Sequence, residues 1–277
     1  MTLAASTAIR RIAPLAGLTA LILATPALAG GAPDKPGETW ELIRDQLWPG
    51  QEIADGDAII DIDTPVRAAD AAIVPIEIRI TPETGRRVEK MVLLVEENPA
   101  PVAAEFTFGE AMGPDVTLST RLRVNAYSNV RAVATLDDGS LVEVGRFVKA
   151  SGGCSAPAAK DAEAALAELG RTKVRDFGRE GAPTGYREAQ VMVRHPQNSG
   201  FQVDQVTLLH IPAFFIDEMT VTLDDTELFR MTGGISISED PALRFTYRDV
   251  GATEMKVTSS DTDGGIYQQR FELQTGS

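Results

Sequence analysis

The sequence predicts an all-β protein made of two immunoglobulin-like antiparallel β-sandwich domains, joined by a partly helical linker that carries a cysteine. Three observations support this prediction. Short runs rich in β-branched and other apolar residues recur along the chain, and in the clearest runs apolar and polar residues alternate. Turn-forming sequences such as Asp137-Asp138-Gly139-Ser140 and Asp263-Gly264-Gly265 separate the runs. Between the two series of runs lies the single cysteine, Cys154.

Residues 1–29 have the pattern of a secretory signal peptide. Arg10 and Arg11 precede an apolar run over residues 12–23, and residues 26–29 end in the Ala-x-Ala motif that signal peptidase accepts. The run is too short to span a bilayer comfortably, and no later segment approaches about 20 consecutive apolar residues. We therefore expect cleavage after Ala29, export to the periplasm, and no membrane association of the mature chain.

Acidic residues outnumber basic residues. The 277 residues include 40 Asp and Glu against 26 Lys and Arg, which gives a formal net charge of −14; loss of the signal peptide, with its two arginines and no acidic residue, makes it −16. Such a surface repels nucleic acid and anionic lipid and attracts basic partners. The same charge also keeps a periplasmic protein soluble, so it does not by itself identify a partner. We expect no nucleic-acid partner.

Residues 38–150 are expected to form the first sandwich. Trp40, Ile43 and Leu47 recur at helical spacing before Pro49-Gly50, which predicts a short amphipathic helix. Strand segments bounded by turn-forming residues follow it; they are 58–63, 74–80, 88–96, 103–108, 116–124, 130–136 and 141–149. Seven short strands at this spacing are typical of an immunoglobulin-like sandwich, although the Cys-Trp-Cys core of antibody domains is missing.

Residues 151–184 are expected to form a glycine- and cysteine-containing arm with a helical linker, and residues 185–277 the second sandwich. Residues 158–169 are rich in alanine and glutamate and precede Gly170, which predicts a helix with a glycine C-cap. The polar run over residues 171–185 is typical of a linker. Strand segments of the second sandwich are 189–194, 203–209, 215–223, 227–231, 243–248, 255–260 and 266–273.

The segment Ser151-Gly152-Gly153-Cys154-Ser155 is where we expect chemistry. A thiolate is the strong nucleophile that this sequence offers, and Gly152 and Gly153 remove side-chain bulk and widen the allowed backbone conformations. We therefore expect Cys154 to be exposed on a flexible arm that can enter a narrow pocket of a partner. Lys149 and Lys160 are near enough in sequence to favour the thiolate modestly. Three other interpretations stay open, namely a buried structural cysteine, a disulfide-linked homodimer and an inert loop residue.

Other candidates for chemistry are few. His195 and His210 are the only histidines, and without further cysteines or an ordered acidic set they do not predict a metal site. A Cys-His nucleophile pair stays open, because such partners are adjacent only in space. No oxyanion-hole motif or nucleophile elbow accompanies Cys154. We expect no metal and no cofactor.

Six short motifs carry a family resemblance. In the first half they are Asp63-Thr64-Pro65-Val66-Arg67-Ala68, Ala72-Ile73-Val74-Pro75-Ile76 and the Gly-Gly-Cys after the last strand, which resemble SoxY of the bacterial thiosulfate-oxidising system. In the second half they are Val193-Arg194-His195-Pro196, Ile211-Pro212-Ala213-Phe214-Phe215-Ile216 and Val221-Thr222-Leu223, which resemble its partner SoxZ. The arrangement in one chain, over residues 58–273, is similar to the fused SoxYZ-like carriers associated with quinoprotein dehydrogenases.

The resemblance implies a carrier rather than an enzyme. In the SoxYZ family, the cysteine of a glycine-rich arm holds a sulfur intermediate covalently while partner enzymes oxidise, cleave and release it. For this chain, the resemblance implies that Cys154 has that role and that Gly152 and Gly153 give the arm its flexibility. The implied partners are periplasmic redox enzymes, either of the Sox type or a quinoprotein dehydrogenase with its cytochrome c. Two glycines follow the cysteine in the family, whereas Ser155, Ala156 and a second domain follow it here, so the arm would swing less freely.

A second function of a different class stays open. The sandwich surfaces would bind a periplasmic quinoprotein (PQQ) dehydrogenase or its cytochrome without covalent chemistry, and the protein would be an adaptor or assembly factor in which Cys154 is incidental. The substitution Cys154→Ser separates the two functions, because a carrier loses all function and an adaptor keeps it.

Overall fold

The secondary structure is almost entirely β-strand. The computed structural model describes residues 37–157 and 166–274. The helices and strands of the first half are α1 (Glu38–Leu47), β1 (Ile53–Asp55), β2 (Ile60–Asp63), β3 (Val74–Ile80), β4 (Val88–Val95), β5 (Val102–Phe108), the 3-10 helix η1 (Glu110–Met112), β6 (Val116–Leu122), β7 (Ser128–Leu136) and β8 (Leu141–Val148). In the second half they are β9 (Thr172–Gly178), β10 (Tyr186–Val193), β11 (Ile216–Leu223), β12 (Thr226–Gly233), β13 (Ala242–Arg248), β14 (Glu254–Asp261) and β15 (Ile266–Glu272).

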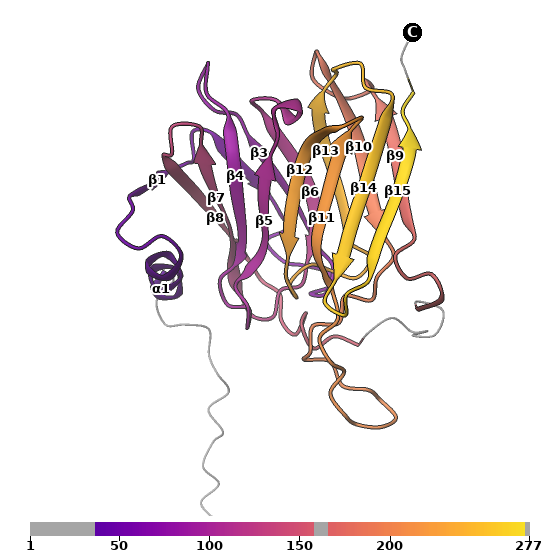
Figure 1. Cartoon of the computed structure of the whole chain (residues 1–277). Helices are drawn as coiled ribbons and strands as arrows, with labels where there is room; N and C mark the ends of the chain where they lie inside the picture. The colour runs from indigo at the N-terminus through magenta and orange to yellow at the C-terminus, as the bar shows by residue number, and fades with distance from the viewer. Residues whose placement is uncertain (1–36, 158–165, 275–277) are drawn as a thin grey trace, which may run out of the picture. The chain divides into compact units, whose positions relative to one another are not determined.

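These strands form two sheets, and each sheet contains strands from both halves of the sequence (Figure 1). The nine-stranded sheet has the order β1-β8-β7-β4-β5-β12-β11-β14-β15, and the six-stranded sheet has the order β2-β3-β6-β13-β10-β9. The halves meet where β5 pairs antiparallel with β12, from Phe108 opposite Phe229 to Ala104 opposite Gly233. They meet again where β6 pairs with β13, at Leu118 opposite Phe245.

The larger hydrophobic core of the described residues lies between the two sheets and extends across both halves. In β3 the alternation predicted from the sequence is present, because the four apolar side chains are buried and the residues between them are less so. Across the meeting point of the halves, the ring of Phe229 contacts the ring of Phe245 edge to face, with 4.9 Å between centroids. Full burial of a side chain of this size contributes about 1.5–3 kcal/mol. The packing therefore joins the two halves into one compact unit within residues 35–277.

The structure confirms the all-β class and the first helix, but it differs from the predicted pair of separate sandwiches, because the halves share both sheets and one core. The immunoglobulin-like topology of each half stays a prediction. The predicted linker contains strand β9, which lies at the edge of the six-stranded sheet, where a strand needs fewer apolar residues. The proposed signal peptide lies outside the described residues, and so does most of the predicted helix over residues 158–169.

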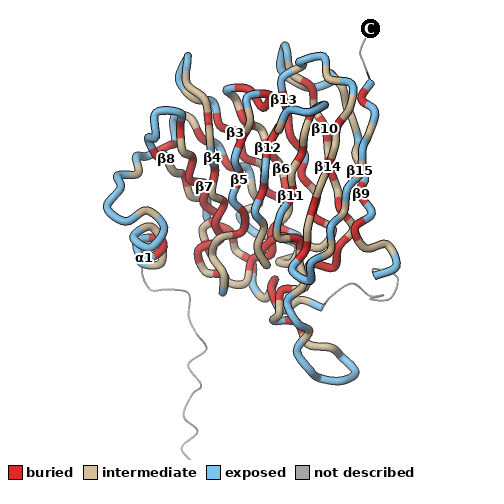
Figure 2. Tube along the Cα trace, viewed as in Figure 1, coloured by how far each residue is buried: buried red, intermediate tan, exposed pale blue. Residues whose placement is uncertain are grey.

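The predicted strand over residues 203–209 is wrong. The segment belongs to a loop between β10 and β11, in which an isolated bridge joins Val203 to His210. Its apolar side chains suggested a core strand, but Val206, Leu208 and Leu209 are 90%, 74% and 69% exposed. The loop projects beyond the sheets at the lower end of the molecule in Figure 1, and Figure 2 shows it as exposed.

Loops from both halves meet at that end of the sheets. They are the segment after β6, the segment after β8 that contains Cys154, and the loop between β10 and β11. In the part of the chain that the structure describes, no helix has the length and apolar character to cross a membrane.

Candidate functional site

Cys154 is buried where these loops meet, and its side chain is 0% exposed. The backbone N–H of Gly152 donates to the carbonyl of Asn125 at 2.8 Å, and that of Gly153 donates to the carbonyl of Val124 at 3.1 Å. The Ser199 hydroxyl, from the second half, donates to the Cys154 carbonyl. The predicted exposure of Cys154 is therefore wrong for this conformation, which we call the closed state.

The two glycines give the cysteine segment its close fit. Gly152 has a φ of +80°, in the left-handed region that favours glycine. A Cβ on Gly153 would lie 2.7 Å from the backbone nitrogen of Val124 and closer still to the carbonyl oxygen of Ala71. The segment can therefore pack against the first half only because residue 153 has no side chain. The role of Gly152 and Gly153 in arm flexibility stays a prediction.

Burial controls the chemistry of the thiol. Loss of hydration raises the pKa of Cys154 to about 11, and the nearby guanidinium of Arg123 opposes this shift. At pH 7 a thiol with such a pKa is ionised in only about one molecule in 10⁴. The closed state therefore holds an unreactive thiol. The cation beside it is Arg123 rather than Lys149, and Lys160 lies outside the described residues.

Arg123 is 1% exposed and connects the cysteine segment to the second half. Its Nη1 donates to the carbonyl of Gly153 at 3.1 Å, and its Nη2 donates to the carbonyl of Gln197 at 3.3 Å. Its Nε is buried without a hydrogen-bond partner. No ion pair found among the described residues includes Arg123. Burial lowers its pKa, but arginine stays protonated in proteins, so a buried positive charge lies beside the thiol.

The second half contributes buried amides as well as the Ser199 hydroxyl. Ser199 and Gln202 are 2% and 0% exposed, and the Oε1 of Gln202 accepts a hydrogen bond of 2.8 Å from the Ser199 backbone. Gln197 is also fully buried, and its Oε1 accepts a hydrogen bond from the backbone of Ile216 at 2.7 Å. The side-chain nitrogens of both glutamines are buried without partners. Both residues therefore have unused N–H donors, and both are joined to the cysteine segment, Gln197 through Arg123 and Gln202 through Ser199.

The structure does not bring the two histidines together. His195 is buried, its Nδ1 accepts a 3.2 Å hydrogen bond from the backbone of Gln197, and its Nε2 lies 3.7 Å from the carboxylate of Asp261. Burial lowers its pKa. His210 is exposed in the projecting loop. Within residues 37–157 and 166–274, no group of three or more His, Cys, Asp or Glu side chains has the arrangement of a metal site.

Arg123 and Ser199 were not predicted as site residues. Arg123 directly follows β6, on the side of the alternation that should face solvent, but the strand ends at Leu122 and the side chain inserts between the halves. Ser199 lies 45 residues after Cys154. No local sequence signal marks either residue, because their importance depends on contacts between distant segments.

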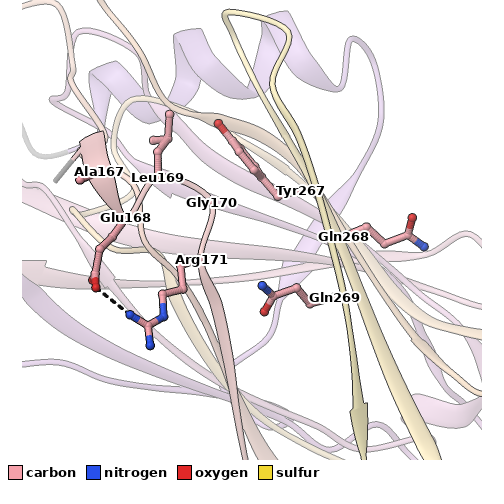
Figure 3. Close-up of a pocket in the computed structure, with 8 residues that line it drawn as sticks. All are labelled: Ala167, Glu168, Leu169, Gly170, Arg171, Tyr267, Gln268 and Gln269. Atoms are coloured by element: carbon pink, nitrogen blue, oxygen red, sulfur yellow. Dashed lines mark hydrogen bonds and ion pairs between the residues drawn. The ribbon is translucent and has the colours of Figure 1, made fainter.

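A surface pocket lies elsewhere, between the 167–171 segment and β15 (Figure 3). Gly170 packs against the Tyr267 ring there, with no room for a side chain at residue 170, and Glu168 pairs with Arg171 at 2.7 Å. The pocket is lined by neither Cys154 nor its hydrogen-bond partners. We assign it no chemistry.

Two family models match the chain. Residues 44–154 match the model of sulfur oxidation protein SoxY, and residues 178–272 match that of sulphur oxidation protein SoxZ. The first match ends at Cys154, and the second lies wholly within the second half. No curated protein sequence matches the chain.

Solved structures resemble parts of the chain. The sulfur carrier protein SoxY from Chlorobium limicola f thiosulfatophilum is 23% identical and aligns over 40% of this chain and 94% of its own, with a TM-score of 0.32. A superoxide reductase (neelaredoxin) from Ignicoccus hospitalis is 16% identical over 33% of this chain and 79% of its own, with a TM-score of 0.28. A putative superoxide reductase from Thermotoga maritima is 15% identical over 36% of this chain and 92% of its own, with a TM-score of 0.29.

These structural similarities are too partial to bear on function. The two family matches do bear on identity, because the SoxY match covers the first half and the SoxZ match covers the second half. Cys154 lies at the end of the SoxY match. The chain is therefore a fused SoxYZ-like protein, in which a SoxY region and a SoxZ region occur in a single polypeptide.

Proposed function

We propose that this protein is a periplasmic covalent carrier that holds a sulfur-containing group on Cys154 and presents it to partner redox enzymes. One observation carries the proposal: the match to the SoxY family ends at Cys154, the sole cysteine of the sequence. Both matching family models describe sulfur oxidation proteins. The expected signal peptide supports the periplasmic location.

Loading of thiosulfate would proceed by oxidation. The thiol loses its proton, its sulfur forms an S–S bond with the outer sulfur of thiosulfate, and two electrons pass to a partner redox enzyme. Of the two reacting atoms, the protein supplies only the sulfur of Cys154. The carrier itself then needs no cofactor, since the electron acceptor belongs to the partner.

Such a carrier must open, because the closed state buries the reacting sulfur. Opening breaks the hydrogen bonds of Gly152, Gly153 and the Cys154 carbonyl described above. At about 0.5–1.5 kcal/mol net for each, and four bonds in all, this costs about 2–6 kcal/mol, which is within the range of local opening in folded proteins. Before loading, the closed state would protect the thiol from oxidation; a partner would shift the equilibrium toward the open state.

The projecting loop over residues 201–213 is the surface we propose for docking a redox partner. Its tip is apolar and exposed, and the carboxylate of Asp204 fixes its shape by accepting hydrogen bonds from the backbones of Val206 and Thr207. Its base reaches the cysteine segment through Gln202 and Ser199. A partner with an apolar groove that holds this tip would therefore be placed beside Cys154.

Intact-protein mass spectrometry tests the carrier function. Protein purified from the periplasm of cells that oxidise thiosulfate should carry adducts of sulfur-containing mass that thiol reductants remove, and Cys154→Ser protein from the same cells should carry none. Ser155→Ala protein serves as a control, since it keeps the thiol and alters only an exposed neighbour. An unmodified thiol in every preparation would overturn the proposal.

Burial of Cys154 favours a second candidate, the non-covalent adaptor or assembly factor for a periplasmic quinoprotein (PQQ) dehydrogenase. In an adaptor the cysteine needs no access to solvent, and its polar surroundings would only fix the junction of the two halves. Cells with Cys154→Ser would then retain full dehydrogenase activity. Loss of activity in that variant, at unchanged protein level and melting temperature, excludes the adaptor.

A further inference from the structure

Arg123 is a buried cation that forms no ion pair among the described residues; the carboxylates of Glu239 and Asp70 attract it only from beyond ion-pair distance. Its guanidinium is 1% exposed and donates to two carbonyl oxygens, and its Nε has no partner. Other buried arginines are paired; Arg131, for example, contacts the carboxylates of Glu96 and Glu143. Burying an unpaired charge costs several kcal/mol, and carbonyl oxygens compensate only part of this cost.

The position of this charge relative to Cys154 is fixed from both halves. The Arg123 backbone donates to the Ser236 carbonyl at 2.8 Å and accepts from the Asn98 side chain at 2.7 Å. Its side chain binds the carbonyl of Gly153, the residue that precedes the cysteine. The guanidinium is therefore held beside Cys154 in the closed state.

We propose that Arg123 is the anion-binding residue of the carrier site, and that it pairs with a negatively charged oxidised sulfur group, such as a terminal sulfonate, on Cys154. The inference rests on the proposed carrier function and names the chemical class of its cargo. When the cysteine segment shifts to accommodate the group, the bond from Nη1 to Gly153 breaks. Nη1 is then free and Nε has no partner, so each can donate a charge-assisted hydrogen bond to an oxygen of the group.

The buried amide of Gln202 adds a further donor. The Oε1 of Gln202 accepts a hydrogen bond from the Ser199 backbone, and the Ser199 hydroxyl donates to the Cys154 carbonyl. The Gln202 amide is therefore connected to the cysteine segment through Ser199. Its Nε2 has no partner in the closed state. An oxyanion near Cys154 would satisfy both this amide and Arg123.

Paired alkylation rates test the assignment. The Cys154 thiolate attacks the CH2 carbon of either iodoacetate or iodoacetamide, a C–S bond forms and iodide leaves into solvent. The two reagents differ chiefly in charge, so the cost of opening cancels in the ratio of their rates. We expect this ratio to be about tenfold higher in the native protein than in the same protein unfolded in urea, since a tenfold effect needs only about 1.4 kcal/mol of attraction. A native ratio equal to or below the unfolded ratio would overturn the proposal without any substitution.

Variants locate the effect on one residue. Arg123→Gln should lower the native ratio about tenfold, and Arg123→Lys should keep most of it because the charge remains. Arg121→Gln is the matched control, since Arg121 also donates to backbone carbonyls of the second half, at Glu239 and Asp240. Its ratio should stay within about twofold of the wild type. An Arg123→Gln ratio that equals the control ratio contradicts the assignment.

The two proposals fail separately. If the ratio behaves as expected but Cys154 never carries sulfur in cells, the carrier function is wrong and the anion site remains. If sulfur adducts form but the ratio does not depend on Arg123, the anion assignment is wrong and the carrier function remains.

Discussion

The sulfur of Cys154 is held in surroundings that disfavour its ionisation. Loss of hydration outweighs the attraction of Arg123 and raises the pKa of the thiol to about 11. Because this pKa lies above the value of the opened chain, the closed state has its full stability below about pH 9 and loses it as pH rises toward 11. Above pH 11 the closed state has therefore lost about 3 kcal/mol of stability relative to the open state.

The pH dependence of alkylation follows from this shift. In the native protein we expect the rate with iodoacetamide to rise about tenfold per pH unit from pH 8 to 10, because the closed thiol is not yet ionised. In the protein unfolded in urea the rate should level off near pH 9. Levelling near pH 9 in the native protein would show that Cys154 is not buried in solution.

Gly153 provides a second prediction at the scale of one residue. In Gly153→Ala the new methyl group would collide with backbone atoms of Ala71 and Val124, which cannot move aside easily, so the segment should leave its place. We expect alkylation of Cys154 to become at least tenfold faster. Gly152→Ala is the comparison variant: its methyl group meets no atom closer than 3.8 Å, so only the strain of a positive φ, about 1–3 kcal/mol, favours opening, and its rate should rise less than that of Gly153→Ala. Equal rates in the two variants would contradict the close fit.

The loop between β10 and β11 holds the cysteine segment from the second half. Removing the Ser199 hydroxyl in Ser199→Ala breaks its hydrogen bond to the Cys154 carbonyl and costs the closed state about 0.5–1.5 kcal/mol. Alkylation should become up to about tenfold faster. Ser155→Ala, which removes only a hydrogen bond within the segment, to the Gly152 carbonyl, should change the rate less. A rate unchanged in Ser199→Ala would mean that the second half does not restrain Cys154.

The tip of the same loop should determine partner affinity without affecting stability. Replacing both Leu208 and Leu209 by Ser removes apolar area that is already exposed, so the melting temperature should not change. Calorimetry with a purified Sox-type redox enzyme should show affinity at least tenfold weaker. Ile266→Ser, also at an exposed apolar residue but on β15, is the control. If the Leu208/Leu209 variant and the Ile266 variant bind the enzyme with equal affinity, this loop is not the docking surface.

Sequence patterns predicted individual elements better than their connections. Alternation over residues 74–80 predicts β3 because one face of that strand is buried, and the Asp-Asp-Gly-Ser turn predicts the pairing of β7 with β8. Cys154 was identified as the candidate site because it is a single residue of distinctive chemistry. Its burial was not predictable, since it depends on contacts of Gly153 with a residue 30 positions away and of Cys154 with a residue 45 positions away.

At the scale of the whole molecule, the halves depend on each other for their sheets. Without the second half, β5 and β6 would both lose a hydrogen-bonded neighbour, and the apolar faces that meet near Phe229 and Phe245 would be exposed. Unpaired strands of this kind aggregate readily. A fusion in one chain keeps the two halves at high effective concentration and so favours their pairing.

We therefore expect the mature chain to unfold in one cooperative transition, with equal calorimetric and van't Hoff enthalpies. Residues 38–157 produced alone should aggregate or bind a dye for exposed apolar surface, and adding residues 166–277 should restore soluble protein. In the restored complex, Cys154 should again alkylate slowly, because Ser199 and Gln197 come from the second fragment. Two separate transitions in the intact chain, or a first half that is stable and protects Cys154 by itself, would show that the shared sheets are not required for the fold.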